Sequence, residues 1–218
     1  MPQALALLDA FGHHRVLDQA ALQRVAQQGL VRFAKRGISP AKSPPRTFGA
    51  DLNPAVHSTA AGQVYLSWPV NVDWDDAKLT YRVQRGNATT TIATLTHTAR
   101  WWETGTLSHL DTTATPGAAT QYRIQTVDPD GNVANSEWVP ITVASTGTLD
   151  PYQAAVYADG AGKYWRLGET GSAVTDHAGR DDRSVTTGLT RGQAGALTTS
   201  TDQAIRFNGT NGVIVSGE

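Results

Sequence analysis

The sequence predicts an all-β protein whose central part folds as a seven-stranded antiparallel sandwich. Thr, Val, Gly and Ala are abundant, and short apolar stretches alternate with turn residues at intervals that suit a sandwich. Within those stretches, apolar and polar residues also alternate one by one, as in antiparallel sheets with one buried face.

Seven strand-like stretches follow one another between residues 47 and 145. They are Thr47–Leu52, Val64–Trp68, Leu79–Arg85, Thr91–Leu95, Leu107–Leu110, Gln121–Asp128 and Trp138–Val143. The residues that should face inward from three of them are Val64, Leu66, Trp68, Leu79, Tyr81, Val83, Tyr122, Ile124 and Thr126. Tyr65 and Ser67 fall on the opposite, solvated face of their strand.

Three motifs make residues 45–145 similar to a fibronectin type III domain. They are `VYLSW`, `LTYRVQRG` and, most specifically, `HLDTTATPGAATQYRIQTVDPDGN`. The resemblance implies a complete sandwich in which Leu110 joins the core with Trp68, Tyr81, Tyr122 and Ile124. It also implies a chain corner at Pro116 and Gly117, and a corner tyrosine, Tyr122, that hydrogen-bonds to the backbone.

Residues 150–218 begin with a short helix. Asp150 is a suitable N-cap, Pro151 suits the first helical position, and Gly160 should end the helix. The strand-like `KYWRLGE` and `IRFNGTNG` that follow resemble the start of a laminin G-like, concanavalin A-type jelly roll. Since only about 70 residues remain, we expect a truncated jelly roll that is either poorly ordered or packed against the sandwich for cover.

Residues 1–44 form an N-terminal tail and a Pro-rich linker in this interpretation. A helix can start at Asp18 and end at Gly29. Alternatively, `VAQQGLVRFAKR` at residues 25–36 resembles the last strand of a bacterial β-propeller. Both alternatives stay open, so the fold class includes a short N-terminal helix or strand segment.

Composition excludes several functions. The net charge of -1 argues against a nucleic-acid partner, and no apolar stretch is long enough to span a membrane. The chain has no cysteine, which removes disulfides and thiolate metal sites. It also carries no `GxSxG` motif, phosphate-binding loop or zinc motif, so we expect no catalytic activity. We also expect the chain to be a monomer.

The candidate ligand site lies where three loops should meet at one end of the sandwich. Its residues are Trp74, Trp101, Trp102, Asp73, Asp75, Asp128 and Asp130. Flat rings stack on the apolar faces of sugars, and carboxylates accept hydroxyl hydrogen bonds. Asp76 should lie at the same end. The alternative is that Trp101 or Trp102 packs under the rim and that the aspartates only solvate the loops.

No cofactor is required by the sequence. `DPDGN` copies the opening of a calcium loop, but Val139 stands where an EF-hand needs Glu, so a hairpin turn is the simpler interpretation. Calcium is compatible with the pole's oxygen ligands, although no ligand spacing demands it.

The function expected from these features is non-catalytic. The chain resembles part of a bacterial secreted or cell-surface multidomain protein, in which a fibronectin module spaces and presents a lectin-like module for carbohydrate or cell-surface binding. The alternatives are a purely structural spacer and an accessory region of an extracellular enzyme whose catalytic domain precedes Met1. An export signal would then lie outside these residues, and the residues do not identify a ligand.

Overall fold

The computed structural model divides the chain into two units, Met1–Ala41 and Lys42–Glu218, which are described separately. The described residues are 6–8, 14–16, 43–100, 102, 105–185, 187–197, 200, 202–212 and 214. In the first unit, strands β1 (Ala6–Leu8) and β2 (His14–Val16) pair antiparallel. The predicted helix after Asp18 and the propeller-like segment 25–36 lie outside the described residues.

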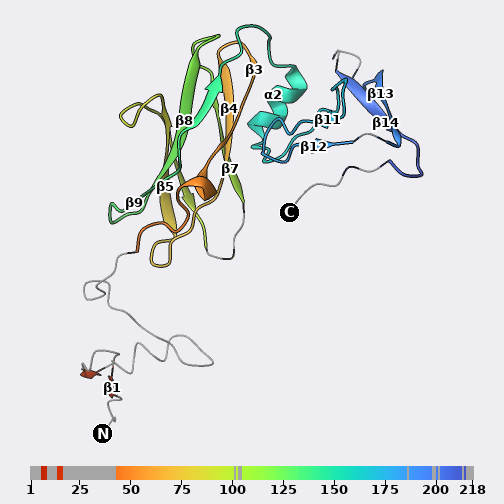
Figure 1. Cartoon of the computed structure of the whole chain (residues 1–218). Helices are drawn as coiled ribbons and strands as arrows, with labels where there is room; N and C mark the ends of the chain where they lie inside the picture. The colour runs from red at the N-terminus through yellow and green to blue at the C-terminus, as the bar shows by residue number, and fades with distance from the viewer. Residues whose placement is uncertain are drawn as a thin grey trace. The chain divides into compact units, whose positions relative to one another are not determined.

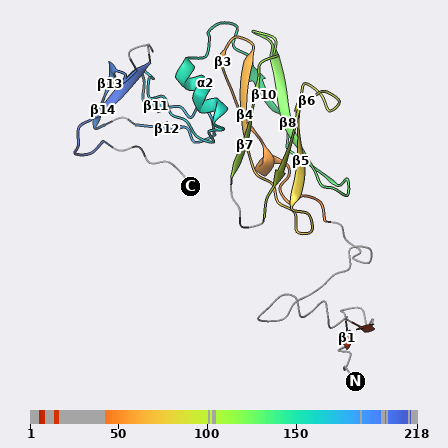
Figure 2. The ribbon, with the colours of Figure 1, turned by 180° about the vertical axis from the view of Figure 1, so that it is seen from behind.

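The second unit contains a sandwich of two antiparallel sheets (Figures 1 and 2). One sheet has the order β3-β4-β7, and the other has the order β10-β8-β5-β6, with β9 also paired to β8. The strands are β3 (Ala55–Ala60), β4 (Gln63–Pro69), β5 (Lys78–Arg85), β6 (Thr91–Thr98), β7 (Thr106–Asp111), β8 (Ala119–Val127), β9 (Val133–Asn135) and β10 (Val139–Thr142). These antiparallel sheets, of three and five strands, confirm the all-β class and the fibronectin type III-like sandwich.

The core between the two sheets consists of the alternating residues that the sequence pattern predicts. Its most buried members are Leu52, Val64, Leu66, Trp68, Leu79, Tyr81, Val83, Tyr122, Ile124 and Val143, each at most 1% exposed. The rings of Trp68 and Tyr81 lie 6.4 Å apart and join the two sheets across this core.

The first predicted strand, Thr47–Leu52, is wrong. The chain instead forms a 3₁₀ turn, η1 (Ala50–Leu52), and strand β3 begins only at Ala55. Gly49 has a φ of 58°, a conformation that glycine adopts without strain, and its carbonyl accepts a hydrogen bond from the Leu52 N–H at 3.1 Å. Leu52 is still buried in the core. Its apolar character therefore indicated burial correctly, although its backbone is not extended.

Leu110 does not share the sandwich core, which corrects a second expectation. In the register of β7 against β4, Leu107 lies opposite Trp68 and Leu110 lies opposite Tyr65. Residues directly opposite each other point to the same face, so Leu107 packs on the core while Leu110 packs on the outer face of its sheet.

The Tyr122 hydroxyl donates to a carboxylate rather than to the backbone. Its acceptor is Oδ2 of Asp111 at 2.8 Å, and Nη1 of Arg85 donates to the same oxygen at 2.7 Å. The other oxygen of Asp111 accepts from the backbone N–H and the hydroxyl of Thr113. Burial alone would raise the pKa of Asp111, but these hydrogen bonds and the Arg85 charge outweigh it and hold the pKa below its usual value.

The C-terminal part begins with the predicted helix, α2 (Pro151–Ala158). The Asp150 side chain accepts a hydrogen bond from the Tyr152 N–H at 2.8 Å, and Gly160 follows the helix with a φ of 75°. The later strands form short antiparallel pairs: β11 (Ala173–Val174) with β12 (Arg183–Ser184), and β13 (Leu189–Ala194) with β14 (Gln203–Phe207). The predicted strand over `KYWRLGE` is wrong, since this stretch makes only an isolated bridge at Trp165. The jelly roll stays a prediction.

Residues 150–185 pack against the outer face of the β3-β4-β7 sheet, one of the two outcomes expected for this segment. The rings of Tyr65 and Tyr157 stack with their centroids 3.9 Å apart and their planes 6° from parallel. The Tyr65 hydroxyl donates to the Ala161 carbonyl at 2.7 Å, and the Ser67 hydroxyl donates to the Ala178 carbonyl at 2.5 Å. The face of β4 that was expected to be wet is therefore covered.

Among the described residues, no helix has the length and apolar character needed to cross a membrane.

Candidate functional site

Three loops meet at one end of the sandwich, at its lower end in Figure 1. They are residues 70–77 between β4 and β5, residues 99–105 between β6 and β7, and residues 128–132 between β8 and β9. The strand registers place them together, because Lys78 at the start of β5 lies opposite Thr98 at the end of β6. The last residue of β8 likewise lies opposite the third residue of β5. We call this end of the sandwich the loop pole.

The base of the first loop is held by a buried asparagine that the sequence did not single out. Asn71 is fully buried, and its side chain accepts from the Thr47 N–H and donates to the Thr47 carbonyl, both at 2.8 Å. The Asn71 N–H also donates to the Tyr81 hydroxyl at 2.8 Å. Burial raises the pKa of Tyr81 to about 12, although its hydrogen bond to the Asn71 backbone opposes the shift. These bonds fix the loop to the core.

Three carboxylates of the loop pole lie close together. Oxygens of Asp75, Asp76 and Asp130 are all within 4.8 Å of one another. Asp75 and Asp130 are exposed, whereas Asp76 is only 5% exposed. The structure therefore joins two residues of the predicted site with Asp76, which had been expected at this end but not as a ligand-binding residue.

Asp73 lies beside these groups and is 7% exposed. Its Oδ1 accepts a hydrogen bond from the Asp75 N–H at 3.2 Å, while its buried Oδ2 has no hydrogen-bond partner. Burial is the main cause that raises the pKa of Asp73 to about 6, and the neighbouring Asp75 carboxyl and the Asp128 charge raise it further. Asp73 is thus a buried carboxyl group that holds its proton more tightly than an exposed aspartate does.

Asp128 shapes the turn between β8 and β9. Its Oδ1 accepts from the Asn132 N–H at 2.8 Å, and its Oδ2 accepts from the Asn132 side chain at 2.7 Å. Gly131 in the same turn has a φ of 92°, which favours glycine. These contacts match the hairpin-turn interpretation of `DPDGN`, and they occupy both oxygens of Asp128.

Two tryptophans of the predicted site are exposed at the loop pole. Trp74 is 59% exposed and Trp102 is 58% exposed. A guanidinium lies over each ring: that of Arg46 is 4.4 Å from the Trp74 centroid, and that of Arg100 is 5.4 Å from the Trp102 centroid. Such a cation over the ring restrains its orientation. Trp101 lies outside the described residues.

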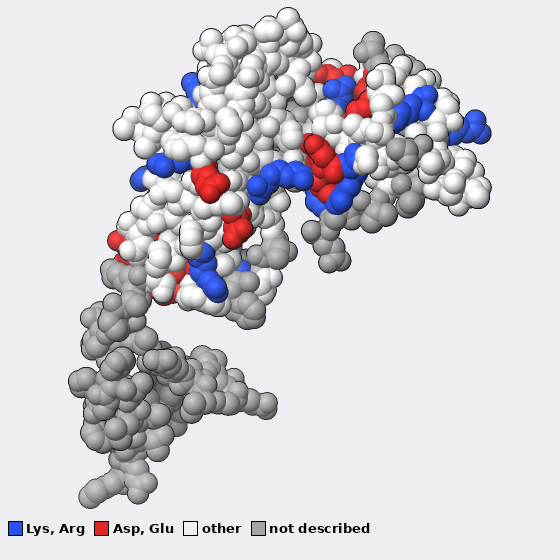
Figure 3. All heavy atoms as spheres, viewed as in Figure 1, with Lys and Arg blue, Asp and Glu red and all other residues white. Residues whose placement is uncertain are grey.

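The surface charges give no sign of a polyanion partner on the face drawn in Figure 3. Acidic and basic side chains are interspersed over the described part of this face. This pattern agrees with the net charge of -1.

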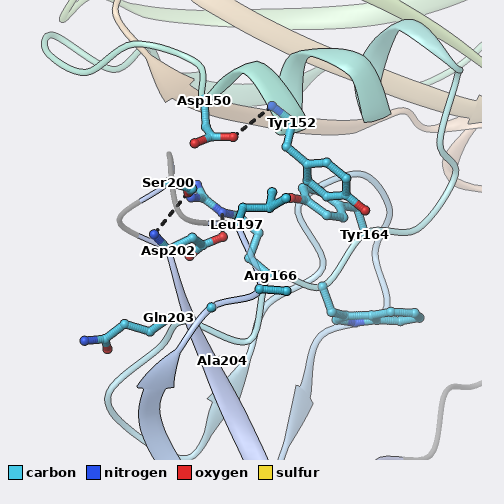
Figure 4. Close-up of a pocket in the computed structure, with 12 residues that line it drawn as sticks. Asp150, Tyr152, Tyr164, Arg166, Leu197, Ser200, Asp202, Gln203 and Ala204 are labelled. Carbon is cyan, nitrogen blue, oxygen red and sulfur yellow. Dashed lines mark hydrogen bonds and ion pairs between the residues drawn. The ribbon is translucent and has the colours of Figure 1, made fainter.

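A pocket of about 320 Å³ lies in the C-terminal part (Figure 4). Its lining comes from the start of α2, the segment around Arg166, and the residues that lead into β14. Tyr152, Tyr164 and Trp165 supply aromatic surface. The Arg166 guanidinium is already engaged, because it donates to Asp202 at 2.8 Å and to the Gln153 side chain at 3.2 Å. The pocket therefore has aromatic walls and an arginine, Arg166, whose charge is balanced by the neighbouring Asp202.

Comparisons with known proteins identify fibronectin type III domains among solved structures, whereas no protein-family model and no curated protein matches the chain. The sixth fibronectin type III domain of human fibronectin type III domain containing protein 3 is 20% identical over 51% of this chain and 98% of its own, with a TM-score of 0.35. The fourth such domain of a human protein is 17% identical over 53% of this chain and 94% of its own, with a TM-score of 0.34. Astrotactin-2, a vertebrate perforin-like membrane protein, is 13% identical over 50% of this chain and 24% of its own, with a TM-score of 0.29.

Proposed function

We propose that this chain is a non-catalytic binding and spacer module of a secreted or cell-surface protein, and that its loop pole binds carbohydrate. The observation that carries the proposal is the exposure of Trp74 and Trp102 on loops that converge beside carboxylates. Large aromatic side chains are usually buried, so two that are more than half exposed at one end of a rigid scaffold mark a recognition surface.

The chemistry of the loop pole suits a sugar better than an apolar ligand. A pyranose offers an apolar face that stacks on an indole and hydroxyls that donate to carboxylates. Asp75 and Asp130 are exposed acceptors close to the tryptophan-bearing loop. The guanidinium groups over the two rings limit their rotation, which reduces the entropy lost when a ligand stacks.

The rival function is that of a spacer without a ligand. In that case the arginines serve only to cover the tryptophans, and the aspartates only to keep the loops soluble. The region would then hold neighbouring domains apart, such as those of a bacterial extracellular enzyme, and the stacked contact of Tyr65 with Tyr157 would stiffen it.

A glycan array probed with the whole chain, followed by titration with the glycan that binds best, separates these functions. Trp74→Ala and Trp102→Ala should each weaken binding about fivefold or more, as is usual for a central tryptophan. Trp138→Ala is the matched control, because Arg123 lies 4.8 Å over its ring although Trp138 precedes β10 and is not in the pole loops. This control should leave the affinity unchanged.

Two other results would contradict the proposal. An array without any bound glycan would favour the spacer. Loss of binding in Tyr152→Ala, with the two pole variants unaffected, would move the site to the C-terminal pocket, whose rim includes the 53% exposed Tyr152.

A further inference from the structure

Residues 150–185, which we call the covering segment, are joined to the outer face of the β3-β4-β7 sheet by a strip of three consecutive carbonyl groups. The strip consists of residues 177–179. In chain order, its carbonyls accept from the hydroxyl of Tyr157 at 2.9 Å, the hydroxyl of Ser67 at 2.5 Å and Nε2 of His57 at 2.7 Å. Since Ser67 lies on β4 and His57 on β3, the strip connects the covering segment to two strands of the sheet.

A buried carboxylate shapes the backbone of this strip. Asp176, which precedes the strip, is fully buried. Its Oδ1 accepts from the N–H groups of Ala178 at 3.1 Å and Gly179 at 2.8 Å, and its Oδ2 accepts from the Asp181 N–H at 3.1 Å. These hydrogen bonds hold the strip in the turn that presents its carbonyls to the sheet.

The imidazole of His177 is the titratable side chain of the strip. It is half-buried, and its ring centroid lies 6.3 Å from that of Tyr164. Charged or titratable groups face it from three other parts of the fold: β3, the segment between α2 and β11, and the residues that lead into β14. These groups are His57, Arg166, Glu169 and Asp202.

The two carboxylates near His177 are already engaged elsewhere. Oε1 of Glu169 accepts from the Thr175 N–H at 3.0 Å and lies 3.8 Å from Nε2 of His177, which is too far for a hydrogen bond. Asp202 accepts from Arg166 at 2.8 Å. Burial of the ring, followed by the Arg166 charge, lowers the pKa of His177 despite the opposing Glu169 charge. The covered ring is therefore a poor site for a cation.

We propose that the strip 177–179 is an acid-sensitive latch, in which protonation of His177 beside His57 and Arg166 loosens the covering segment from the sheet. When the segment detaches, the ring reaches water, where the pKa of an imidazole is about 6.5. Because the attached segment binds this proton less tightly than the detached one, detachment becomes more favourable as the pH falls through that value. Detachment uncovers the face of β4 that carries Tyr65. This proposal does not depend on carbohydrate binding at the loop pole.

Hydrogen exchange of the whole chain at about pH 7.5 and about pH 5.5, on either side of the ordinary histidine pKa, tests the latch. Labelling times are scaled for the intrinsic exchange rate at each pH. Protection of residues 150–185 should fall roughly tenfold at the lower pH, which is the factor for a difference of one pKa unit between the two states. Strands β5 and β8 should keep their protection, because the opening is local.

The variant His177→Gln keeps a polar side chain that does not titrate, so its covering segment should show the same protection at both pH values. His97→Gln is the matched control, because His97 lies on β6 in the other sheet. This control should lose protection on acidification as the wild type does. In addition, an NMR titration of the wild-type His177 ring should give a midpoint below that of an unfolded histidine peptide.

Three results would overturn the proposal. The first is wild-type protection of residues 150–185 that is unchanged on acidification or that falls together with protection of β5 and β8. The second is a His177→Gln variant that still loses protection as the wild type does. The third is a midpoint of the His177 ring at or above that of the peptide, and this result decides the matter if His177→Gln leaves the segment unprotected at both pH values.

Discussion

Removing the Asp111 carboxylate should strongly destabilise the sandwich, because it leaves the buried Tyr122 hydroxyl and the partly buried Arg85 guanidinium without their acceptor. Asp111 is 2% exposed and accepts from Tyr122, Arg85 and Thr113 at distances of 2.7–2.8 Å. Breaking a buried charged pair by removing one partner costs about 3–5 kcal/mol. Asp111→Ala should therefore lose that much free energy of unfolding at pH 7. Tyr122→Phe, which removes one hydrogen bond to a charged acceptor, should lose about 1.5–3 kcal/mol.

Urea unfolding of the two single variants and the double variant measures these costs and their coupling. The double variant should cost less than the sum of the single ones, since both remove the same hydrogen bond. The pKa of Asp111 is depressed in the folded protein, so its contribution is present at neutral pH and is lost as the pH falls through the folded pKa. Strictly additive costs, or an Asp111→Ala variant within about 0.5 kcal/mol of the wild type, would refute this role for the carboxylate.

Three further predictions concern the core, the covered sheet and the loop pole. Trp68→Ala should lower the free energy of unfolding by about 3–5 kcal/mol in denaturant titrations, because Trp68 is 1% exposed and its removal leaves a cavity that neighbours cannot fill. A loss below about 1 kcal/mol would contradict its place in the core. Tyr157→Ala removes the ring stacked on Tyr65, so hydrogen exchange in residues 150–185 should accelerate while exchange in β4 changes less; unchanged protection of that segment would show that the stack does not hold it. The raised pKa of Asp73 means that the folded protein binds a proton at this residue more tightly than the unfolded chain does. The free energy of unfolding of the wild type in chelator should therefore fall by up to about 3 kcal/mol as the pH rises from 4 through about 6. Asp73→Asn should flatten this part of the pH profile, and an identical profile in both proteins would exclude Asp73 as its source.

Local patterns in the sequence predicted much of the sandwich correctly. Alternation identified strands β4, β5 and β8 with their buried faces, since a half-buried strand must repeat every second residue. Capping chemistry identified α2, because Asp150 and Pro151 act through neighbouring backbone groups. Each of these features depends on residues that are close in the chain.

The errors arise where structure depends on distant partners. Leu110 fits an inward pattern, but the register of β7 against β4 turns it to the outer face. Tyr65 and Ser67 were assigned to solvent because the segment that covers them comes some 100 residues later in the chain, with contacts at sequence separations of 96 and 111 residues. The `KYWRLGE` stretch has strand propensity, yet it pairs only at Trp165, and a strand needs a continuous neighbour.

The meeting of three loops at one end was predicted through the topology of the sandwich. That topology brings together the loops of Trp74, Trp102 and Asp130, as expected. It could not show that Asp128 uses both its oxygens within its own turn, or that Asp76 joins the carboxylate group. Side-chain directions within loops depend on hydrogen bonds such as those of Asn71, which leave no periodic pattern in the sequence.

The most direct test of carbohydrate binding at the loop pole is a two-dimensional NMR spectrum of the tryptophan indole N–H groups during titration with the glycan selected by the array. The chain has 6 tryptophans, so each resonance is assigned by one substitution. If the loop pole binds the glycan, the indole signals of Trp74 and Trp102 shift in a saturable way, while the signal of the buried Trp68 does not. Shifts confined to Trp165 in the C-terminal pocket, with Trp74 and Trp102 unmoved, would contradict binding at the loop pole.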